Sequence, residues 1–434
     1  MATLDRRDIQ GNIVRGYRLP FAAHVFLAIG TREKAQQFLH EIRFTSDETQ
    51  PGRLTRAINV AFTFAGLSKL RNCADLESRF VAFHQGMPKR AELLGDDPKA
   101  YLGFWQKCDI WLSIYGRSEQ AVEQELRDIR RNAGNDLELL GVERAAAIVK
   151  AEGERQLWFE HFGFRDGISN PVLEGVDDSK PAGPGTGRVG PNGTWLPIRT
   201  GELLCGYEND AGDPIPDGEL GALLRNGTFV AVRKLEQRVR AFRAYLSDAS
   251  AHYGVPAHEL AEKIVGRRRD GTPLVAASNL NDFDYAEDRI GQGCPLGSHV
   301  RRVHPRDVTD GGGTSGRHRL IRRGMPYGLA PIDGTPPGSG KTDSDDCGLL
   351  FIGLNANIEE QFEFIQRFWI NASSRSAISN DWDPLAGAHA TTGKLVVPRE
   401  DLPLLLADLP RFVHSKGGQY FFMPGLAALR SLCG

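Results

Sequence analysis

The sequence predicts an α+β protein made of two ferredoxin-like halves with antiparallel sheets. Three observations predict this class. The first third reads as β-α-β, a helical insert, then β-α-β, which is the split βαβ pattern of a ferredoxin-like sheet. The last third repeats the order more loosely, and a bridge rich in glycine and proline, at about 175–225, separates the two. We therefore expect an N-terminal domain over residues 1–190 and a C-terminal domain over residues 191–434.

The elements of the first third follow from hydrophobic periodicity. Apolar runs or alternation predict strands, and apolar residues at helical spacing predict helices. Ser118 is a suitable N-cap for the second helix, and Glu119 in its first turn suits the helix dipole. The predicted strands are 24–29, 57–64, 109–116 and 143–149, and the predicted helices are 32–42 and 118–132.

The last third gives the same types of element. A second loop rich in glycine and proline, 333–348, interrupts it, and loops of this length in a compact chain are usually functional or mobile. The predicted strands are 227–235, 318–324, 348–355 and 418–425, and the predicted helices are 236–249 and the amphipathic 358–371.

Composition narrows the class of function. A net charge of −2 argues against nucleic acid as a partner. No apolar stretch reaches the roughly 18 residues of a membrane span, and the first residues have no apolar core of a signal peptide. Six scattered cysteines without a CxxC pair argue against a zinc site and favour a reducing, cytoplasmic location.

Three stretches can carry chemistry: "GFRDG" (163–167), "CPLGSHVRRVHPRD" (294–307) and "LIRRGMPYG" (320–328). Asp166 is either a turn aspartate or a general acid/base held rigidly between glycines. His299 is either a structural or surface residue or a ligand, and ligation of haem iron is one of several chemistries that it suits together with an acid and an arginine. Arg306 belongs to a basic cluster that is either solvated or binds carboxylates. Arg322 is either an exposed strand residue or a group that offsets negative charge.

Several further segments connect these stretches to one family. "GFRDG" resembles the GxxDG signature of the dye-decolorizing peroxidases. The similarity continues, in the order of that family, over 8–17, 226–237, 294–306, 322–328 and 348–366, and so covers essentially the whole chain. The resemblance implies two ferredoxin-like domains of the dimeric α+β barrel type, with haem b between the sheet and the helices of the C-terminal half.

The resemblance also implies roles for particular residues. Asp166 would be the acid/base on the peroxide side of haem, with Gly167 beside it against the cofactor, and Arg322 would assist cleavage of the O–O bond. His299 would ligate the iron, and Arg306 would bind a haem propionate. Leu349 and Phe351 would cover the haem face, and strand alternation puts both on one side.

Two positions depart from the family pattern or have no assignment from it. His304 stands where the family usually has asparagine, and we interpret it as a structural contact rather than as a second ligand. The carboxylate that should accept from the ring N–H of His299 is not identified by any motif, and Glu363 is the candidate. Surface aromatic residues that could pass electrons inward are Trp158, Trp369, Trp382 and Tyr327.

The function implied is that of a haem b peroxidase. It reduces hydrogen peroxide and oxidises phenols, aromatic amines and bulky dyes through ferryl intermediates, as a monomer or homodimer. One alternative is a haem- or porphyrin-binding or sensing protein without peroxidase turnover, which needs His299 and Arg306 but not Asp166. A non-haem oxidoreductase or hydrolase is a further alternative, because fold alone does not decide function.

Overall fold

The computed structural model describes residues 4–48, 54–134, 136–153, 155–176, 181–277, 279–306, 317–329, 346–372, 382–388 and 392–434. The predicted loop at 333–348 therefore lies outside the described residues except for its last three positions. Among the residues that are described, no helix combines the length and the apolar character that a membrane span requires.

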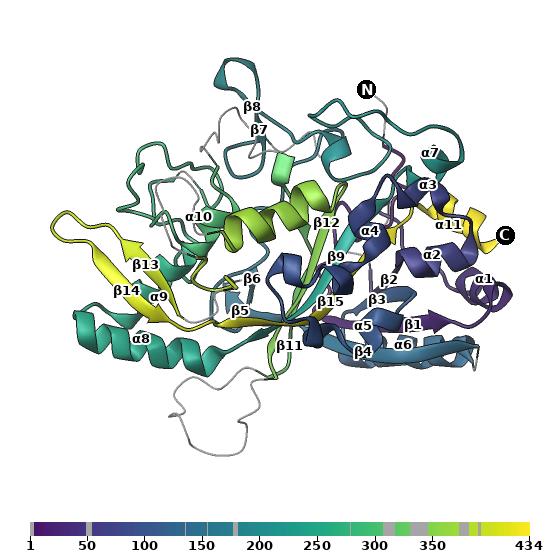
Figure 1. The fold of residues 1–434 in the computed structure, drawn as a ribbon, viewed down its shortest axis with the longest axis horizontal. Coiled ribbons are helices and arrows are strands. Elements are labelled where there is room, and N and C mark those ends of the chain that lie inside the picture. The colour runs from purple at the N-terminus through teal and green to yellow at the C-terminus, as the bar shows by residue number, and fades with distance from the viewer. Residues whose placement is uncertain are drawn as a thin grey trace.

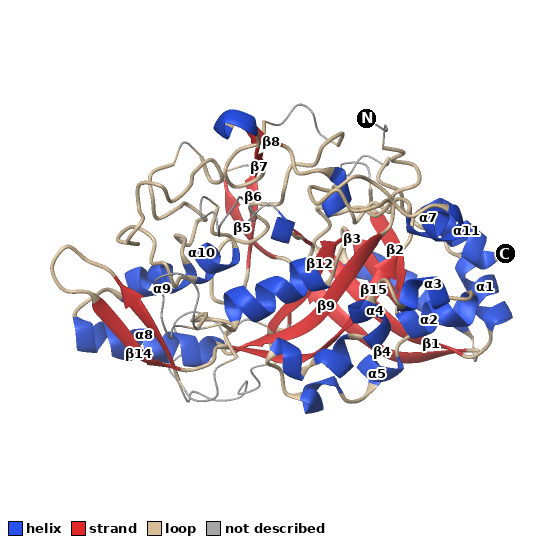
Figure 2. Ribbon diagram, turned by 45° about the horizontal axis from the view of Figure 1, so that its top comes forward, coloured by secondary structure: helices blue, strands red, loops and turns tan. Residues whose placement is uncertain are grey.

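One antiparallel sheet of nine strands dominates the molecule, and both halves of the chain contribute to it (Figures 1 and 2). Its order is β10-β12-β9-β15-β2-β3-β1-β4, and β11 also pairs with β12. The N-terminal half supplies β1 (Phe21–Ile29), β2 (Arg56–Phe62), β3 (Ile110–Gly116) and β4 (Leu137–Ala146). The C-terminal half supplies β9 (Thr228–Gln237), β10 (Ile321–Arg322), β11 (Met325–Tyr327), β12 (Gly348–Asn355) and β15 (Val413–Met423).

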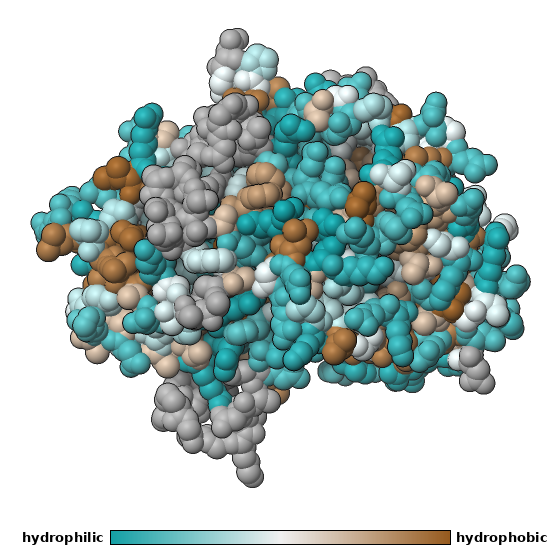
Figure 3. Space-filling model, viewed as in Figure 1, coloured by the Kyte–Doolittle hydropathy of each residue, from teal (hydrophilic) through white to brown (hydrophobic). Residues whose placement is uncertain are grey.

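Three small hairpin sheets lie outside the main sheet. They are β5 (Ile148–Glu152) with β6 (Arg155–Phe159), β7 (Arg188–Val189) with β8 (Trp195–Leu196), and β13 (Gly393–Val397) with β14 (Leu404–Leu409). Figure 3 shows apolar side chains at the surface near the β13–β14 hairpin, on the left of the view. Val396, Leu402 and Leu405 are exposed there.

Helices cover the sheet and fill the connections. The α-helices are α1 (Arg32–Glu41), α2 (Phe64–Leu70), α3 (Ala74–Glu77), α4 (Val81–Gln85), α5 (Phe104–Lys107), α6 (Glu119–Ala133), α7 (Gly218–Leu224), α8 (Val239–Tyr253), α9 (Ala257–Val265), α10 (His299–Val303) and α11 (Leu426–Cys433). Short 3-10 helices are η2 (Met87–Arg90), η3 (Glu92–Leu94), η4 (Pro98–Tyr101), η5 (Pro191–Gly193) and η6 (Thr200–Glu202). Two π-helices, η8 (Glu359–Glu363) and η9 (Ile365–Ile370), lie over β12.

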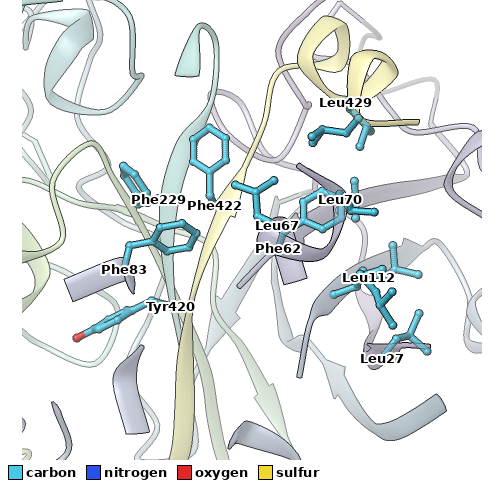
Figure 4. Close-up of a cluster of buried hydrophobic side chains, with 14 of the residues drawn as sticks. Leu27, Phe62, Leu67, Leu70, Phe83, Leu112, Phe229, Tyr420, Phe422 and Leu429 are labelled. Atoms are coloured by element: carbon cyan, nitrogen blue, oxygen red, sulfur yellow. The ribbon is translucent and has the colours of Figure 1, made fainter. Parts of the chain in front are cut away.

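The two halves share a hydrophobic core as well as a sheet. In Figure 4, Phe62 and Leu67 of the N-terminal half lie beside Phe422 of β15, and Phe83 lies beside Phe229 of β9. The rings of Phe83 and Phe229 have centroids 5.2 Å apart, within the range of favourable aromatic pairs. This architecture agrees with the predicted class of two ferredoxin-like units, and the structure adds that the two join edge to edge in one sheet. The predicted division at residue 190 stays a prediction.

Most of the predicted elements are confirmed, and three predictions needed correction. The helix predicted over 358–371 exists, but amide groups bond to carbonyl groups five residues back, as Glu363 does to Ile358. The strand predicted over 318–324 is too long, because only Ile321 and Arg322 pair with β12. The strand predicted over 143–149 is instead the end of β4 and the start of β5, so the first residues of β4 were missed.

Candidate active site

A cavity of about 340 Å³ lies between the sheet and helices α10 and η9. Strands β9, β10 and β12 form one wall, helices α10 and η9 form the opposite wall, and the 160–169 segment closes one side. Six of the seven predicted site residues line this single cavity: Asp166, His299, Arg306, Arg322, Leu349 and Phe351. Gly167 does not line it, so its predicted contact with a cofactor stays a prediction.

His299 is the first residue of α10, and its ring is held by a buried carboxylate. The Nδ1 atom lies 2.8 Å from Oδ2 of Asp383, whose side chain is fully buried. The other carboxylate oxygen accepts hydrogen bonds from the amides of Leu385 and Ala386. Burial acts to raise the pKa of Asp383, but the nearby His299 outweighs it and holds that pKa below its ordinary value. Nε2 is therefore the ring nitrogen available to bind a metal.

Asp383 corrects the expectation that Glu363 would be the partner of His299. Both carboxylate oxygens of Glu363 bind the guanidinium group of Arg90, at 2.5 Å each, and one also accepts from the hydroxyl of Tyr420. No sequence pattern marks Asp383, which lies 84 residues after its partner. Only the folded chain brings the two together.

The "GFRDG" segment forms a tight turn that places Asp166 at the cavity. Gly163 and Gly167 have φ angles of 93° and 74°, which side chains disfavour, and a Cβ on Gly163 would lie 2.6 Å from the guanidinium group of Arg269. The amide of Asp166 donates to the carbonyl of Trp158 at 2.9 Å. The backbone of the turn is thus fixed around the carboxylate.

Asp166 forms an ion pair with Arg322, and the rest of its loop wraps the same arginine. The guanidinium group lies 3.2 Å from Oδ1 of Asp166 and donates to the carbonyl of Ile168 at 2.7 Å. The backbone amide of Arg322 donates to Oδ1 of Asn170 at 3.0 Å. Sequence reasoning missed Asn170, although its place four residues after the acid could have suggested a role in the turn.

Buried arginines form one end of the cavity. Arg306 donates to the carbonyls of Asn281 and Phe283 at 2.8 and 2.9 Å, and its guanidinium group lies over the Phe283 ring. Arg319 donates to a carbonyl and lies against the ring of His304, so His304 makes a contact within the protein, and its interpretation as a structural residue rather than a second ligand stays a prediction. Burial first, and then the charge of Arg306, lower the pKa of Arg319 to about 9.

Arg267 completes this basic end. Burial, followed by the charge of Arg306, lowers the pKa of Arg267 to about 10. Its guanidinium group donates to two backbone carbonyls and to the hydroxyl of Ser169. These acceptors are neutral, so an anion bound here would relieve the electrostatic cost of the buried charges.

The residues of the cavity fit a haem group. Leu349 and Phe351 provide an apolar wall on β12, and Val300 and Ile365 provide the wall opposite. A porphyrin brings nitrogen ligands of its own, so one protein side chain would be enough to hold its iron, and His299 would be that side chain. Among the described residues, no three or more histidine, cysteine or acidic side chains gather to hold a bare metal ion. The basic end matches the carboxylates of the cofactor.

The candidate aromatic residues for electron transfer differ in exposure. Trp369 and Tyr327 are buried, at 4% exposed each. Trp158 and Trp382 are half-buried. Their role in electron transfer stays a prediction.

The fold and this cavity define a class of α+β protein in which an acid–arginine pair and a histidine–aspartate pair line one cavity between a sheet and helices. Residues 215–391 match the model of the C-terminal part of Dyp-type peroxidases. The chain is 30% identical, over 89% of its length, to a dye-decolorizing peroxidase of Mycena epipterygia, of which it covers 77%. It is 29% identical to a multifunctional dye peroxidase of Amycolatopsis sp., covering 98% of this chain and 95% of that protein.

The solved structure of a fungal DyP-type peroxidase from Auricularia auricula-judae has the same fold. It superposes over the whole of both chains with a TM-score of 0.81, at 23% identity. The chain belongs to the dye-decolorizing peroxidase family. It is accordingly a haem-dependent peroxidase, an oxidoreductase that uses peroxide as the electron acceptor.

Proposed function

We propose that the cofactor is haem b, that His299 binds its iron through Nε2, and that Asp166 and Arg322 activate hydrogen peroxide on the other side. The observation that carries this proposal is that the His299–Asp383 pair and the Asp166–Arg322 pair line the same cavity. When bound, haem b supplies the redox centre at which the O–O bond breaks and two oxidising equivalents are held.

Asp166 accepts a proton from the first peroxide oxygen and returns it to the second, so that water can leave. Arg322 lies beside this carboxylate, where its positive charge offsets the negative charge that develops as the O–O bond breaks. Two phenol molecules then each supply one electron and one proton. The balance is H2O2 + 2 ArOH → 2 H2O + 2 ArO•.

The remaining residues hold and tune the site. Asp383 accepts from Nδ1 of His299 and thereby raises the basicity of the nitrogen that binds iron. Arg306 binds a carboxylate of haem b, and Arg319 and Arg267 add positive charge at the same end. Leu349 and Phe351 exclude water from the face at which peroxide reacts.

The reducing substrates we infer are phenols, aromatic amines and dyes. One relative carries the description multifunctional dye peroxidase, and the solved structure of another dye-decolorizing peroxidase holds 2,6-dimethoxyphenol. These descriptions support the same substrate class for this chain.

The test is a UV–visible titration of the haem-loaded protein with one equivalent of hydrogen peroxide. The wild-type Soret band is expected to shift within the mixing time and to return when a phenol is added. Asp166→Asn should keep the initial band but react with peroxide about 10²- to 10⁴-fold more slowly, because the proton acceptor is lost. An unchanged rate would remove Asp166 from the mechanism. The absence of any Soret band would remove the haem assignment of His299.

A further inference from the structure

The cavity has a second polar end that the mechanism above does not use. It is formed by Arg233 and Gln237 of β9, by Arg411, and by Ser415 of β15, all of which line the cavity. We call this set the Arg233–Arg411 end. Strand β15, which carries Ser415, lies three strands away from β10, which carries Arg322, so these two strands are about 14 Å apart across the sheet, and β9 lies between them.

The strand register fixes the position of this end relative to the apolar wall. Arg233 lies directly opposite Phe351, and Leu235 lies directly opposite Leu349, in the antiparallel pairing of β9 with β12. On its other side Leu235 pairs with Ser415. The Arg233–Arg411 end therefore continues the wall beneath the cofactor site, on the side away from Arg322.

The charges at this end do not balance. Arg233 and Arg411 both pair with one carboxylate, that of Asp96, whose side chain is fully buried. The contact to Arg233 is a direct hydrogen bond, whereas the Arg411 nitrogen lies 3.7 Å from the other oxygen. The hydroxyl of Tyr101 also donates to Asp96, at 2.6 Å. Within the described part of the chain, neither arginine forms an ion pair with a second acid.

Polar atoms at this end also lack partners. Nε of Arg233 and Oε1 of Gln237 are buried, and neither has a hydrogen-bond partner among the described residues. Arg233 and Gln237 are only 4% and 5% exposed, so bulk water does not satisfy these atoms. Since β9 alternates, the two side chains lie on the same face of the strand, four residues apart. An anion can satisfy the unpartnered donor of Arg233, whereas Oε1 of Gln237 is an acceptor and would need a donor, so the arginine is the group that calls for a negatively charged ligand.

The nearby acid Glu160 is bound by other donors, and among the described residues it forms no ion pair with Arg233 or Arg411. Its carboxylate accepts from the amides of Phe162 and Phe164 at 2.8 Å each, and from the side chain of Gln237. Burial raises the pKa of Glu160 above its ordinary value, and the hydrogen bonds from Phe162, Phe164 and Gln237 oppose that shift.

We propose that the Arg233–Arg411 end binds the carboxylate or sulfonate group of an acidic aromatic reductant. This inference rests on the proposed peroxidase function and names a substrate class for it. Arg411 provides the approach from solvent, because its side chain is 21% exposed, whereas Arg233 is enclosed. The cofactor does not compete, because both carboxylates of haem b project from one edge of the ring and Arg306, Arg319 and Arg267 attract them to the other end.

The first experiment measures equilibrium binding to the haem-loaded protein by calorimetry, with benzoate and with its neutral analogue benzamide as probes. Arg411→Gln should weaken benzoate binding about tenfold, because a charge-assisted hydrogen bond is lost, and should leave benzamide binding unchanged. Arg411→Lys keeps the charge and should restore part of the affinity. Arg367→Gln is the matched control: this arginine lies over the ring of Phe368 and does not line the cavity.

Two results would overturn the proposal. One is benzoate binding by Arg411→Gln with wild-type affinity. The other is that Arg411→Gln retains haem less well than the wild type does but retains haem dimethyl ester equally well, which would assign this end to the cofactor. Steady-state kinetics with 4-hydroxybenzoate and 4-hydroxybenzamide give an independent readout, in which Arg411→Gln should raise KM for the acid about tenfold relative to the amide. If neither phenol is oxidised by the wild type, the proposed function fails, while the benzoate titration still decides the binding site.

Discussion

Asp383 holds the ring of His299 from a separate segment of the chain, with Oδ2 2.8 Å from Nδ1. Because the carboxylate is fully buried and fixed by two backbone amides, it presents a negative charge in a constant position. This geometry makes the ring a stronger electron donor through Nε2.

Replacing Asp383 with asparagine should therefore weaken iron binding by His299 about 10- to 100-fold. Loss of the negative charge should also move the reduction potential of the bound iron upward, because the ferric state is stabilised less. Titration with haem, followed at the Soret band, measures the first effect, and spectroelectrochemistry measures the second. Equal potentials in the two proteins would show that Asp383 does not tune the metal.

Glu363 provides the contrasting case, because its carboxylate serves the fold. It is fully buried and binds Arg90, so Glu363→Gln leaves a cation without its counter-charge. The expected cost is about 3–5 kcal/mol of unfolding free energy, measured by urea denaturation. The reduction potential of bound haem should stay at the wild-type value, and a shift as large as that of Asp383→Asn would contradict a purely structural role for Glu363.

Asn170 is expected to position Arg322. Asn170→Ala removes the acceptor for the Arg322 backbone amide, so the guanidinium group should lose its fixed place beside Asp166. We expect the reaction with peroxide to slow about tenfold, with haem affinity unchanged. Stopped-flow mixing measures the rate. Asn170→Asp keeps a side-chain oxygen and should recover most of the wild-type rate. Equal rates for Asn170→Ala and the wild type would show that Asn170 does not position Arg322.

His24 should make the fold less stable in acid. It is 1% exposed, and burial lowers its pKa from 6.5 to about 4. Between these values the unfolded chain takes up a proton that the folded chain does not, so the unfolding free energy falls as pH decreases. The full contribution is roughly 3 kcal/mol, lost between about pH 6.5 and pH 4.

The change His24→Gln should flatten this part of the stability curve, because glutamine has no proton to gain and still offers an acceptor to Trp111. Urea denaturation at several pH values measures the slope. The exposed His40 is the control position, and its replacement by glutamine should leave the slope as in the wild type. Burial raises the pKa of Glu202 to about 7, so this residue makes the unfolding free energy rise as the pH decreases, opposite to His24. Both proteins contain Glu202, so its contribution cancels when their slopes are compared.

Local patterns were sufficient to predict most of the fold. Ser118 caps α6 as expected, with its side chain accepting from the amide of Ala121, and the strands with continuous or alternating apolar residues pair in the main sheet. Short elements were harder to predict. Residues 321–322 pair because β12 is beside them, which is a tertiary contact that no local pattern records.

The same limit applies to the cavity. Asp166, His299 and Arg322 lie in motifs, and the structure brings their side chains to one cavity. Asp383 and Arg233 lie in no motif, since their roles come from neighbours that only folding supplies. Which charges are paired and which buried polar atoms lack a partner depends on how distant segments pack, so these features are seen only in the folded structure.

The position of β15 has a consequence for biosynthesis. This strand, Val413–Met423, lies in the middle of the sheet, between β9 and β2, and joins the two halves. While the ribosome is still translating the residues before it, the two halves have no shared sheet, and the wall that includes Ser415 does not exist. The pocket for haem is thus completed only after residues 413–423 have emerged, so loading of the cofactor has to wait for this strand.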